Sequence, residues 1–408
     1  MHRPSSPGQF PETADVVVIG GGVVGVSTAF QLARHGVRRV LLLERRHLAA
    51  GATGKSGALV RAHYTNVPET QLTLESLKVF QNWDEHVGVG NPGFKKLGFL
   101  RVVHPAEEPY LRANVAVQQQ LGGDTQIVTA EDLRDIEPLL NTDDLTIAAF
   151  EPHSGYADPG ATVYGFARAA IDAGVTILEQ TEVTAILCAR GRVRGLETSK
   201  GPILTDTVVV AAGAYANSLL LPLGLDFDLF PRRVQVAVFR WPLAMDGIAS
   251  HRVVIDSINN SWLRPEGEYG TLIGVEHGVR SATDPDNYLE TVDAGYVDYA
   301  RNALAARFPV FENAVMRGAW SGVFMQSPDD HPIIDHVPSA EGLFISTGDS
   351  GSSFKTAPAV GICLAQWITT GEPQLMDLTA FRSTRFAEGR PWIDERAYRH
   401  GERLSVSR

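Results

Sequence analysis

The sequence is poor in cysteine, with only Cys188 and Cys363 among 408 residues, and their positions show no metal-binding or redox spacing. Both cysteines stand in apolar stretches, so we expect two small buried side chains and a reducing compartment. No stretch approaches the roughly 18 uninterrupted apolar residues that a membrane helix needs. The first fourteen residues are polar and proline-rich, which argues against a signal peptide. These absences predict a cytoplasmic protein without a metal site or a membrane partner.

Positive charge is also scarce, because 36 lysines and arginines face 47 acidic residues and leave a net charge of -11. Such a balance argues against non-specific binding to nucleic acid or to an anionic membrane. The 408 residues are too many for one small domain and predict two or three domains. The 39 glycines cluster beside apolar runs, as is typical of α/β enzymes that bring their backbone close to a ligand.

Short, wholly apolar runs predict strands that are covered on both faces, and they occur early, midway and late in the chain. Between them, alternation over 234–239 predicts a half-buried strand, and 261–263 with 271–275 predicts a hairpin. The sequence therefore predicts an α/β fold, in which a Rossmann-type domain is interleaved with an α+β domain on a mostly antiparallel sheet. We expect buried strands at 15–19, 40–43, 207–212 and 342–347, and helices over 23–35, 69–87, from 293 to 308, and from about 357 to 368.

Domain boundaries follow from this alternation of element types. We place the Rossmann-type domain at 13–95, 151–232 and 322–385, the second domain at 96–150 and 233–321, and surface tails at 1–12 and 396–408.

The segment DVVVIGGGVVG, residues 15–25, places Gly20, Gly22 and Gly25 between a predicted strand and a predicted helix. Gly20 permits a tight turn, Gly22 lets a pyrophosphate approach the backbone, and Gly25 lets the helix lie close to the strand. Glu44 ends the second strand, where a carboxylate can accept hydrogen bonds from ribose hydroxyls and would repel a 2′-phosphate. The pattern predicts a dinucleotide site and disfavours NADP.

Three glycine-rich turns favour FAD over NAD. The loop after Glu44 offers backbone amides with the hydroxyls of Thr53 and Ser56, a buried strand ends at Ala212-Gly213, and GDSGSSFKTAPAVG places a turn before a helix N-terminus. Turns so far apart in sequence suit an extended cofactor that lies across the fold.

These motifs together resemble the D-amino-acid oxidase superfamily of FAD-dependent oxidoreductases, nearest to its branch of sarcosine oxidases, dimethylglycine oxidases and N-methyl amino acid dehydrogenases. The resemblance covers nearly the whole chain and rests on DVVVIGGGVVG with Glu44, GATGKSGALVR, SGYADP, VVVAAGAYA, SPDDHPIID and GLFISTGDSGSSFKTAPAVG. It implies oxidation of the carbon next to a secondary or tertiary amine by hydride transfer to the flavin, after which the imine hydrolyses.

The resemblance also assigns roles to single residues. Arg61 and Lys355 match an arginine and a lysine that bind the substrate carboxylate, and two cations on separate loops can clamp one anion. The alternatives are a salt bridge for Arg61 and a solvated position for Lys355 at a helix start. Glu276, His277 and Phe324 are further candidates for the catalytic site.

For the cofactor, the motifs and the resemblance predict contacts from the N-terminal, middle and C-terminal turns. The expected residues are Gly20, Gly22, Val23, Val24, Gly25, Glu44, Arg45, Thr53, Lys55, Ser56, Gly57, Ala58, Val183, Ala211, Ala212, Gly213, Gly322, Gly348, Ser350, Gly351, Ser352, Ser353, Phe354 and Lys355.

Several positions depart from the family pattern. Gly322 and Lys55 stand where other members attach the flavin, so we expect FAD that is held without a covalent bond. Leu272 stands where a lysine promotes reaction with oxygen, so either another cation substitutes or the acceptor is not oxygen. Ala58 and Phe324 replace an arginine and a pocket tyrosine, which argues against sarcosine itself as the substrate.

Three hypotheses of function stay open. The protein oxidises a carboxylate-bearing secondary or tertiary amine, or it oxidises a primary amino acid or a 2-hydroxy acid, or it is a flavin-binding subunit without catalysis. The sequence leaves open whether the chain assembles with itself or with another protein. His63 and Tyr64 share the loop of Arg61, and for His331 we favour a structural or flavin-contact role over proton transfer.

Overall fold

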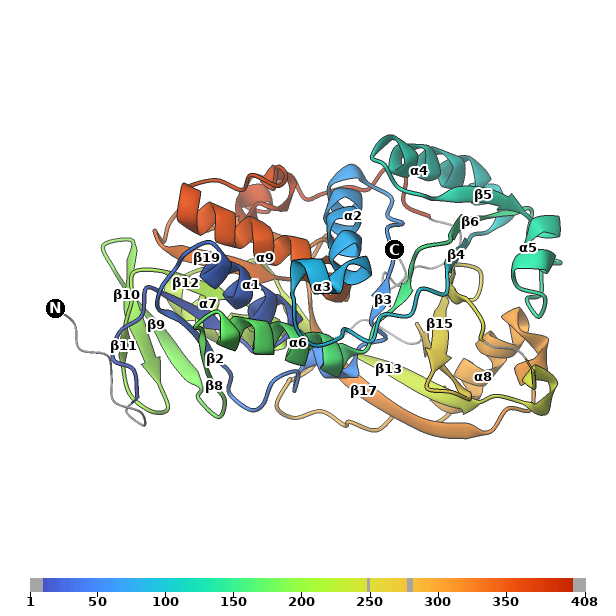
Figure 1. Ribbon diagram of the computed structural model, residues 1–408, viewed down its shortest axis with the longest axis horizontal. Helices are drawn as coiled ribbons and strands as arrows, with labels where there is room; N and C mark the ends of the chain where they lie inside the picture. The colour runs from blue at the N-terminus through green and yellow to red at the C-terminus, as the bar shows by residue number, and fades with distance from the viewer. Residues whose placement is uncertain (1–9, 248–249, 277–281, 399–408) are drawn as a thin grey trace.

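The computed structural model describes residues 10–247, 250–276 and 282–398. A parallel sheet and a mostly antiparallel sheet lie side by side along the long axis of the molecule (Figure 1). This is the predicted fold class. Within the described ranges, no helix is long and apolar enough to span a bilayer.

The first sheet has six strands, which are parallel except for its first pair. Their order is β18 (Ile333–His336), β19 (Leu343–Thr347), β12 (Val208–Val210), β1 (Val16–Ile19), β2 (Val40–Leu43) and β8 (Thr176–Leu178). Helices pack on one face, namely α1 (Val23–Arg34), α6 (Pro159–Asp172) and α9 (Ser353–Thr370). The other face is covered by α7 (Ala216–Leu220) and by a small sheet of β9 (Val183–Ala189), β10 (Arg192–Thr198) and β11 (Ile203–Leu204). Because both faces are covered, β1, β2 and β12 are buried throughout, as their apolar runs predict.

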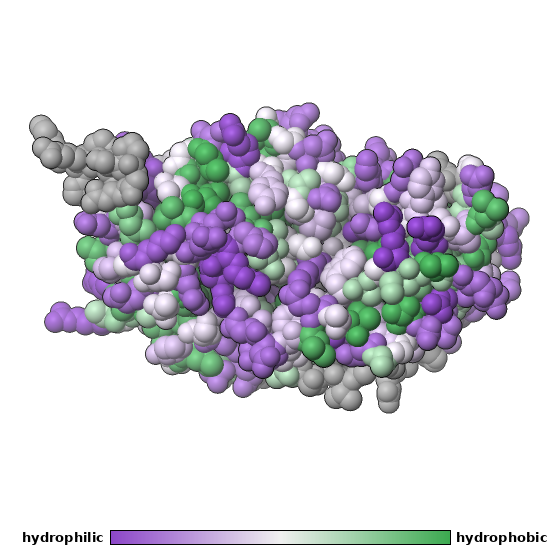
Figure 2. Space-filling model, turned by 90° about the horizontal axis from the view of Figure 1, so that it is seen from below, coloured by the Kyte–Doolittle hydropathy of each residue, from purple (hydrophilic) through white to green (hydrophobic). Residues whose placement is uncertain are grey.

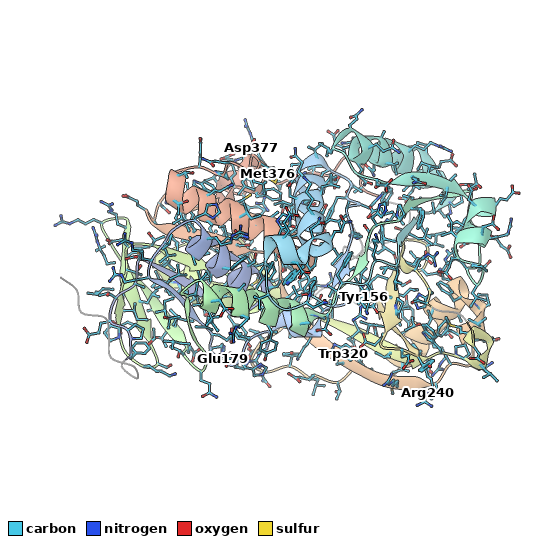
Figure 3. All side chains as sticks on the ribbon, viewed as in Figure 1. Tyr156, Glu179, Arg240, Trp320, Met376 and Asp377 are labelled. Carbon is cyan, nitrogen blue, oxygen red and sulfur yellow. The ribbon has the colours of Figure 1, made fainter. Side chains whose placement is uncertain are left out.

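The second sheet has eight strands, all antiparallel except for the pair β14 and β4. Their order is β17 (Met316–Gln326), β13 (Phe230–Arg240), β16 (Gly270–Val275), β15 (Ser261–Glu266), β14 (Val253–Asp256), β4 (Phe99–Val102), β6 (Ile147–Glu151) and β5 (Gln126–Thr129). The predicted hairpin is β15 with β16. In Figure 3, Trp320 of β17 lies near the middle of the molecule, whereas Arg240 at the end of β13 lies at the outer edge.

Strand β13 is buried on both faces over 236–239, so the prediction of a half-buried strand was wrong. Val236 and Val238 pack with Leu272 on one face, and Ala237 and Phe239 pack on the other face beneath α8 (Tyr296–Arg307). Apolar side chains pack on both faces of this sheet. The alternation of residues within one strand does not reveal that the second face is covered.

Helix boundaries differ from the predictions at three places. The predicted helix 69–87 is broken at Asn82, whose φ of -125° and ψ of 48° end α2 (Val67–Gln81) before α3 (Trp83–His86) begins. Helix α9 begins at Ser353, four residues before the predicted start, and tolerates Pro358 within it. Helix α8 begins after Gly295 and not at Asp293, whose carboxylate accepts hydrogen bonds from Arg233 and Gln235 instead. The remaining elements are α4 (Glu108–Gln120), α5 (Ala130–Ile136) and the short pair β3 (Leu59–Val60) and β7 (Gly155–Tyr156).

Two predictions about burial were also wrong. Cys188 is exposed, because it lies on the edge strand β9 of the small sheet, whereas Cys363 is fully buried. Tyr398, in the segment predicted as a surface tail, has only 6% of its surface exposed. The chain therefore stays packed against the protein to the end of its described part.

Exposed apolar side chains do not form one continuous area on the face drawn in Figure 2, where green residues lie apart among purple ones. Over the whole described surface, the most exposed large apolar side chains are Leu243, Leu289, Val315 and Ile393.

A buried ion pair fixes the second sheet to its helix. Arg307 of α8 donates from Nε to Asp256 of β14 over 2.8 Å, and neither side chain has measurable exposure. We expect Arg307→Met to lower the free energy of unfolding by about 3–5 kcal/mol, because it leaves a buried carboxylate without its partner cation. The exposed pair of Arg112 and Glu108 provides the control, and Arg112→Met should have a much smaller effect, because solvent screens an exposed ion pair. Urea unfolding measures both, and equal effects would contradict the buried role.

Candidate functional site

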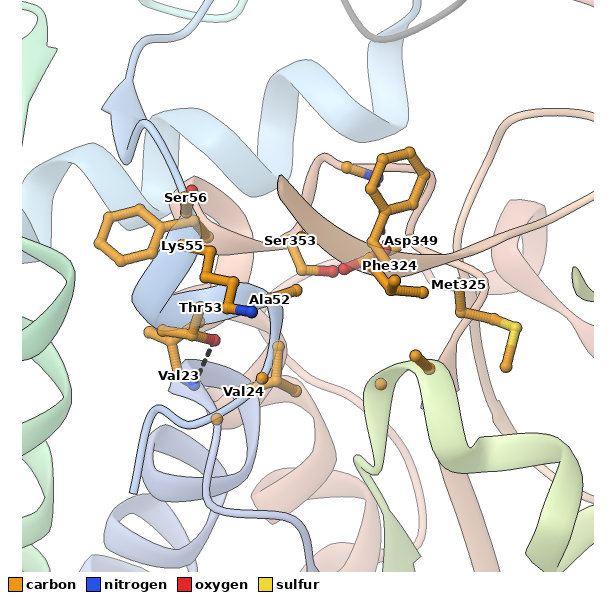
Figure 4. A pocket seen from close by; sticks show the side chains of 18 of the residues that line it. Val23, Val24, Ala52, Thr53, Lys55, Ser56, Phe324, Met325, Asp349 and Ser353 are labelled. Atoms are coloured by element: carbon orange, nitrogen blue, oxygen red, sulfur yellow. Dashed lines mark hydrogen bonds between the residues drawn. The ribbon is translucent and has the colours of Figure 1, made fainter. Parts of the chain in front are cut away.

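A long cavity lies where the two sheets meet. Its lining comes from the carboxyl ends of β1, β2 and β12, from the inner faces of β13, β16 and β17, and from the start of α9. Its volume is about 2420 Å³, including the part that opens to solvent. The lining joins the turn at Gly20 to β13, β17 and the start of α9, so the cavity suits an extended ligand that contacts segments far apart in sequence. Figure 4 shows side chains from α1, from the short helix at 52–55, from β17 and from the start of α9 converging on it.

The glycine motif lies at one end of this cavity. Gly20 has φ +115°, and a Cβ there would lie 2.3 Å from the carbonyl oxygen of Ala211. Gly20, Gly22, Val23 and Val24 all line the cavity. The backbone N–H of Val23 donates to Thr53 Oγ1 over 3.2 Å, as drawn in Figure 4. The turn therefore presents backbone and a helix N-terminus to the cavity, an arrangement that binds phosphate groups.

Gly25 does not line the cavity, contrary to the prediction of a cofactor contact. A Cβ at this position would lie 1.9 Å from the carbonyl oxygen of Gly20. Gly25 instead has the packing role that the sequence predicted, because its lack of a side chain lets α1 lie against the end of β1.

Glu44 stands at the end of β2 and lines the same region. Its carboxylate accepts from the N–H of Gly21 over 2.7 Å and from the N–H of Arg46 over 2.8 Å. These two bonds fix its orientation and leave lone pairs for a ligand, since a carboxylate offers about four acceptor positions. Beside it, Arg45 stacks on Tyr215 at 4.2 Å and donates to Asp286 over 2.8 Å.

The loop after Glu44 contributes Thr53, Lys55, Ser56, Gly57 and Ala58, all of which line the cavity. Lys55 does not point into open space, because its Nζ donates to Tyr288 over 2.6 Å and to Glu290 over 2.8 Å. Its stem covers Gly322, where a Cβ would meet Lys55 at 3.2 Å. The middle segment contributes Val183, Ala211, Ala212 and Gly213.

The C-terminal turn lines the cavity with Gly348, Gly351, Ser353, Phe354 and Lys355. Two predicted contacts, Ser350 and Ser352, do not reach it. Ser350 Oγ accepts from the side chain of Gln326 over 2.9 Å, and Ser352 Oγ donates to the carbonyl of Asp349 over 2.7 Å. Both hydroxyls are thus engaged in hydrogen bonds that shape the turn.

Arg61 and Lys355 meet on one aromatic ring. The Arg61 guanidinium lies 4.7 Å from the centre of the Tyr64 ring, and Lys355 Nζ lies 5.1 Å from the same ring. Both line the cavity and are buried, with 3% and 7% exposure. The alternative of a solvated lysine is therefore wrong. Burial raises the pKa of the nearby Asp349 carboxyl, and the charge of Lys355 acts against that rise.

An opposite charge stands in the same cavity. Glu276 is buried, lines the cavity, and forms an ion pair of 3.7 Å with Arg232, which is buried as well. Arg232 lies 5.9 Å from the ring of Phe324, another lining residue. His277 lies outside the described residues.

Three other residues named from the sequence lie away from the cavity lining. His331 Nδ1 is 3.0 Å from Glu69 and its ring stacks on Trp392 at 4.1 Å, so its described contacts are with packed protein side chains. His63 is buried and bonded to Tyr398. Leu272 is fully buried beside Val236 and Val238 and does not line the cavity.

Sequence reasoning missed the tryptophans of the wall. A Cβ on Gly57 or on Gly274 would lie 2.3 Å or 2.4 Å from the Trp262 ring, so the indole occupies a slot between two glycines. Trp320 lines the cavity too and donates to the carbonyl of Lys55 over 3.2 Å. A glycine inside a predicted strand, such as Gly274, is the one signal that could have indicated this close approach.

Comparison with known proteins gives matches of three kinds, to a family model, to protein sequences and to a solved structure. The family model described as FAD dependent oxidoreductase matches residues 15–367. Sarcosine oxidase subunit beta of Rhodobacter capsulatus is 26% identical over 400 residues, covering 93% of this chain and 90% of that protein. Mitochondrial dimethylglycine dehydrogenase of Mus musculus is 25% identical over 95% of this chain, which spans only 46% of that longer protein. The crystal structure of L-proline dehydrogenase from P. horikoshii has a TM-score of 0.84 at 28% identity, covering 93% of this chain and 99% of that one.

The close contact between Gly25 and Gly20 allows a test of cofactor binding at this end of the cavity. We expect Gly25→Ala to lower the amount of flavin that copurifies with the protein, because its methyl group forces α1 away from the turn. Gly318→Ala is the control, since no atom lies within 4 Å of its Cβ position. Absorbance of bound flavin per protein measures the effect, and equal flavin content in the two variants would contradict it.

Proposed function

The chain belongs to the DAO family of FAD-dependent oxidoreductases that act on amino acids or amines, and we propose that its substrate is a secondary or tertiary amine with a carboxylate. The observation that carries this proposal is the meeting of two buried cations, Arg61 and Lys355, on the Tyr64 ring at the cavity. In the proposed reaction, the carbon next to nitrogen loses a hydride, and water hydrolyses the resulting imine to an amine and a carbonyl compound.

The residues of the cleft fit FAD. The turn at Gly20 and Gly22 has no room for side chains and offers backbone to a diphosphate, and Glu44 offers a fixed carboxylate to a ribose. The loop around Thr53 and Ser56 begins beside this turn, and together with the start of α9 it lines the part of the cavity where the flavin ring would be held. When bound, FAD supplies the hydride acceptor.

The carboxylate clamp gains strength from its surroundings. A planar guanidinium can hold a carboxylate through two hydrogen bonds, and an ammonium adds a second charge. Trp262, Trp320 and Phe324 line the same cavity and displace water, so charges interact more strongly there than in solvent. A carboxylate held by Arg61 and Lys355 therefore fixes the position of the carbon that reacts.

Glu276 is proposed to contact the amine end of the substrate. Its buried carboxylate lines the cavity, and its pairing with Arg232 is long at 3.7 Å. A carboxylate there can accept a hydrogen bond from an amine N–H, which places the substrate between a cationic and an anionic end. Amine oxidation of this type needs an unprotonated amine and no strong base, so we assign Glu276 to positioning.

Substrate class is tested by anaerobic bleaching of the flavin with pairs of compounds. We expect N-methyl amino acids or L-proline to bleach it, and the corresponding amines without the carboxylate to react poorly.

Lys355→Met should raise the concentration of a carboxylate-bearing amine that gives half-maximal bleaching roughly ten- to a hundredfold, because a charged hydrogen bond is lost. Lys78→Met, at an exposed pair with Glu75, is the control.

The outcomes separate the alternatives. Fastest bleaching by glycine favours a primary amino acid as substrate, and fastest bleaching by lactate favours a 2-hydroxy acid. A flavin that no compound bleaches indicates a subunit without catalysis. If an amine without a carboxylate bleached it fastest, the clamp would be refuted. Readmission of air then shows whether oxygen reoxidises the flavin.

Attachment of the flavin is tested by denaturation. Neither cysteine nor histidine lines the cavity within the described part of the chain, and Gly322 is covered by Lys55. We therefore expect acid precipitation to release all yellow colour into the supernatant. Colour that stays with the washed pellet would show a covalent bond.

A further inference from the structure

The loop that carries Arg61 is fastened by a segment more than three hundred residues away in sequence. The carboxylate of Asp394 accepts hydrogen bonds from Thr65 Oγ1 and from Asn66 Nδ2. Nearby, Asn114 Nδ2 of α4 donates to the carbonyl of Arg396 over 3.1 Å. Residues 394–398 thus form a strap, which we call the C-terminal strap, across the loop 61–66.

Tyr398 is the deepest residue of this strap. Its ring packs with Val103, Leu111 and Ala149, and its exposure is 6%. Its hydroxyl lies 2.6 Å from His63 Nε2 and accepts from Asn114 Nδ2 over 3.1 Å. The rings of Tyr398 and His63 are stacked with their centres 5.9 Å apart.

The direction of the bond between these rings follows from their protonation. Burial, helped by the charges of Arg101 and Arg61, holds the pKa of His63 well below its usual value. Burial also raises the pKa of the Tyr398 hydroxyl, which therefore keeps its proton. A neutral imidazole can accept at one nitrogen, so the Tyr398 hydroxyl donates to His63 Nε2.

His63 in turn holds Arg61. The guanidinium of Arg61 donates from Nη1 to the backbone carbonyl of His63, and it lies 4.7 Å from the Tyr64 ring and 5.5 Å from the Phe99 ring. A shift of His63 would move this carbonyl and with it the guanidinium. The contacts therefore run in one line from the strap to the proposed carboxylate clamp.

We propose that Tyr398 is a positioning residue for substrate binding, which through His63 fixes the orientation of the Arg61 guanidinium. The proposal rests on the proposed function, because it takes Arg61 to bind the substrate carboxylate. Tyr398 does not line the cavity, so it would act through His63 and Arg61 on the affinity for the acid.

Tyr398→Phe tests the proposal, since it keeps the ring and removes only the hydroxyl. We expect KM for a carboxylate-bearing amine to rise roughly three- to tenfold, as suits the loss of one buried hydrogen bond. The limiting rate of anaerobic bleaching and the flavin content should stay near wild type. Ser383→Ala is the matched control, because Ser383 is a buried hydroxyl that donates to Asp335 over 2.6 Å, away from this loop.

A double-mutant cycle separates this inference from the proposed function. In an Arg61→Met background, Tyr398→Phe should have no further effect on KM. If Arg61→Met raises KM strongly while Tyr398→Phe leaves it unchanged, or if Tyr398→Phe acts equally in both backgrounds, the positioning role is overturned and the clamp stands. If Arg61→Met leaves KM unchanged, the clamp itself is refuted.

A second variant covers the case in which Tyr398→Phe does not fold. His63→Phe keeps a ring and the backbone carbonyl but removes the nitrogen that accepts from Tyr398. It should raise KM by a similar factor, again with flavin content preserved. An unchanged KM in folded His63→Phe would overturn the proposal.

Discussion

The close approach of the first helix to the first strand, where Gly25 faces the carbonyl of Gly20, is the contact on which the cofactor cleft depends. Because no side chain separates the two backbones, the helix N-terminus and the amides of the turn open onto the cavity. Glu44 then lies beside the turn, fixed by the N–H of Gly21. The turn proposed to hold the diphosphate and the carboxylate proposed to hold the ribose are thereby placed side by side, with Arg45 next to Glu44 in the same lining.

The other end of the cavity has a different electrostatic character. Arg61 and Lys355 are buried and share the Tyr64 ring, while Glu276 and Arg232 form a second charged pair on the wall. Holding such charges away from water is costly unless each has partners, and a substrate carboxylate would add one for the cationic pair. Aromatic residues line the cavity between the two sheets, and a small charged molecule bound beside them would interact more strongly with these charges than it does in solvent.

The sequence predicted those features of the fold and site that depend on residues close together in the chain. The motif around Gly20, the carboxylate Glu44 and the buried strands were found because each depends on neighbours within a few residues. The position of Trp262, the pairing of Arg232 with Glu276 and the burial of Tyr398 depend on elements that meet only in the folded chain. The break at Asn82 and the exposure of Cys188 were missed for the same reason, since helical periodicity and apolar composition do not show which faces are covered.

The most direct measurement of the central claim is a titration of flavin-free protein with FAD, followed by the loss of flavin fluorescence. We predict saturation at one FAD per chain and weaker binding by Glu44→Ala, because the carboxylate proposed to hold the ribose is then missing. Protein that remains colourless and leaves the fluorescence of added FAD unchanged would contradict the assignment of the cleft and the chemistry built on it.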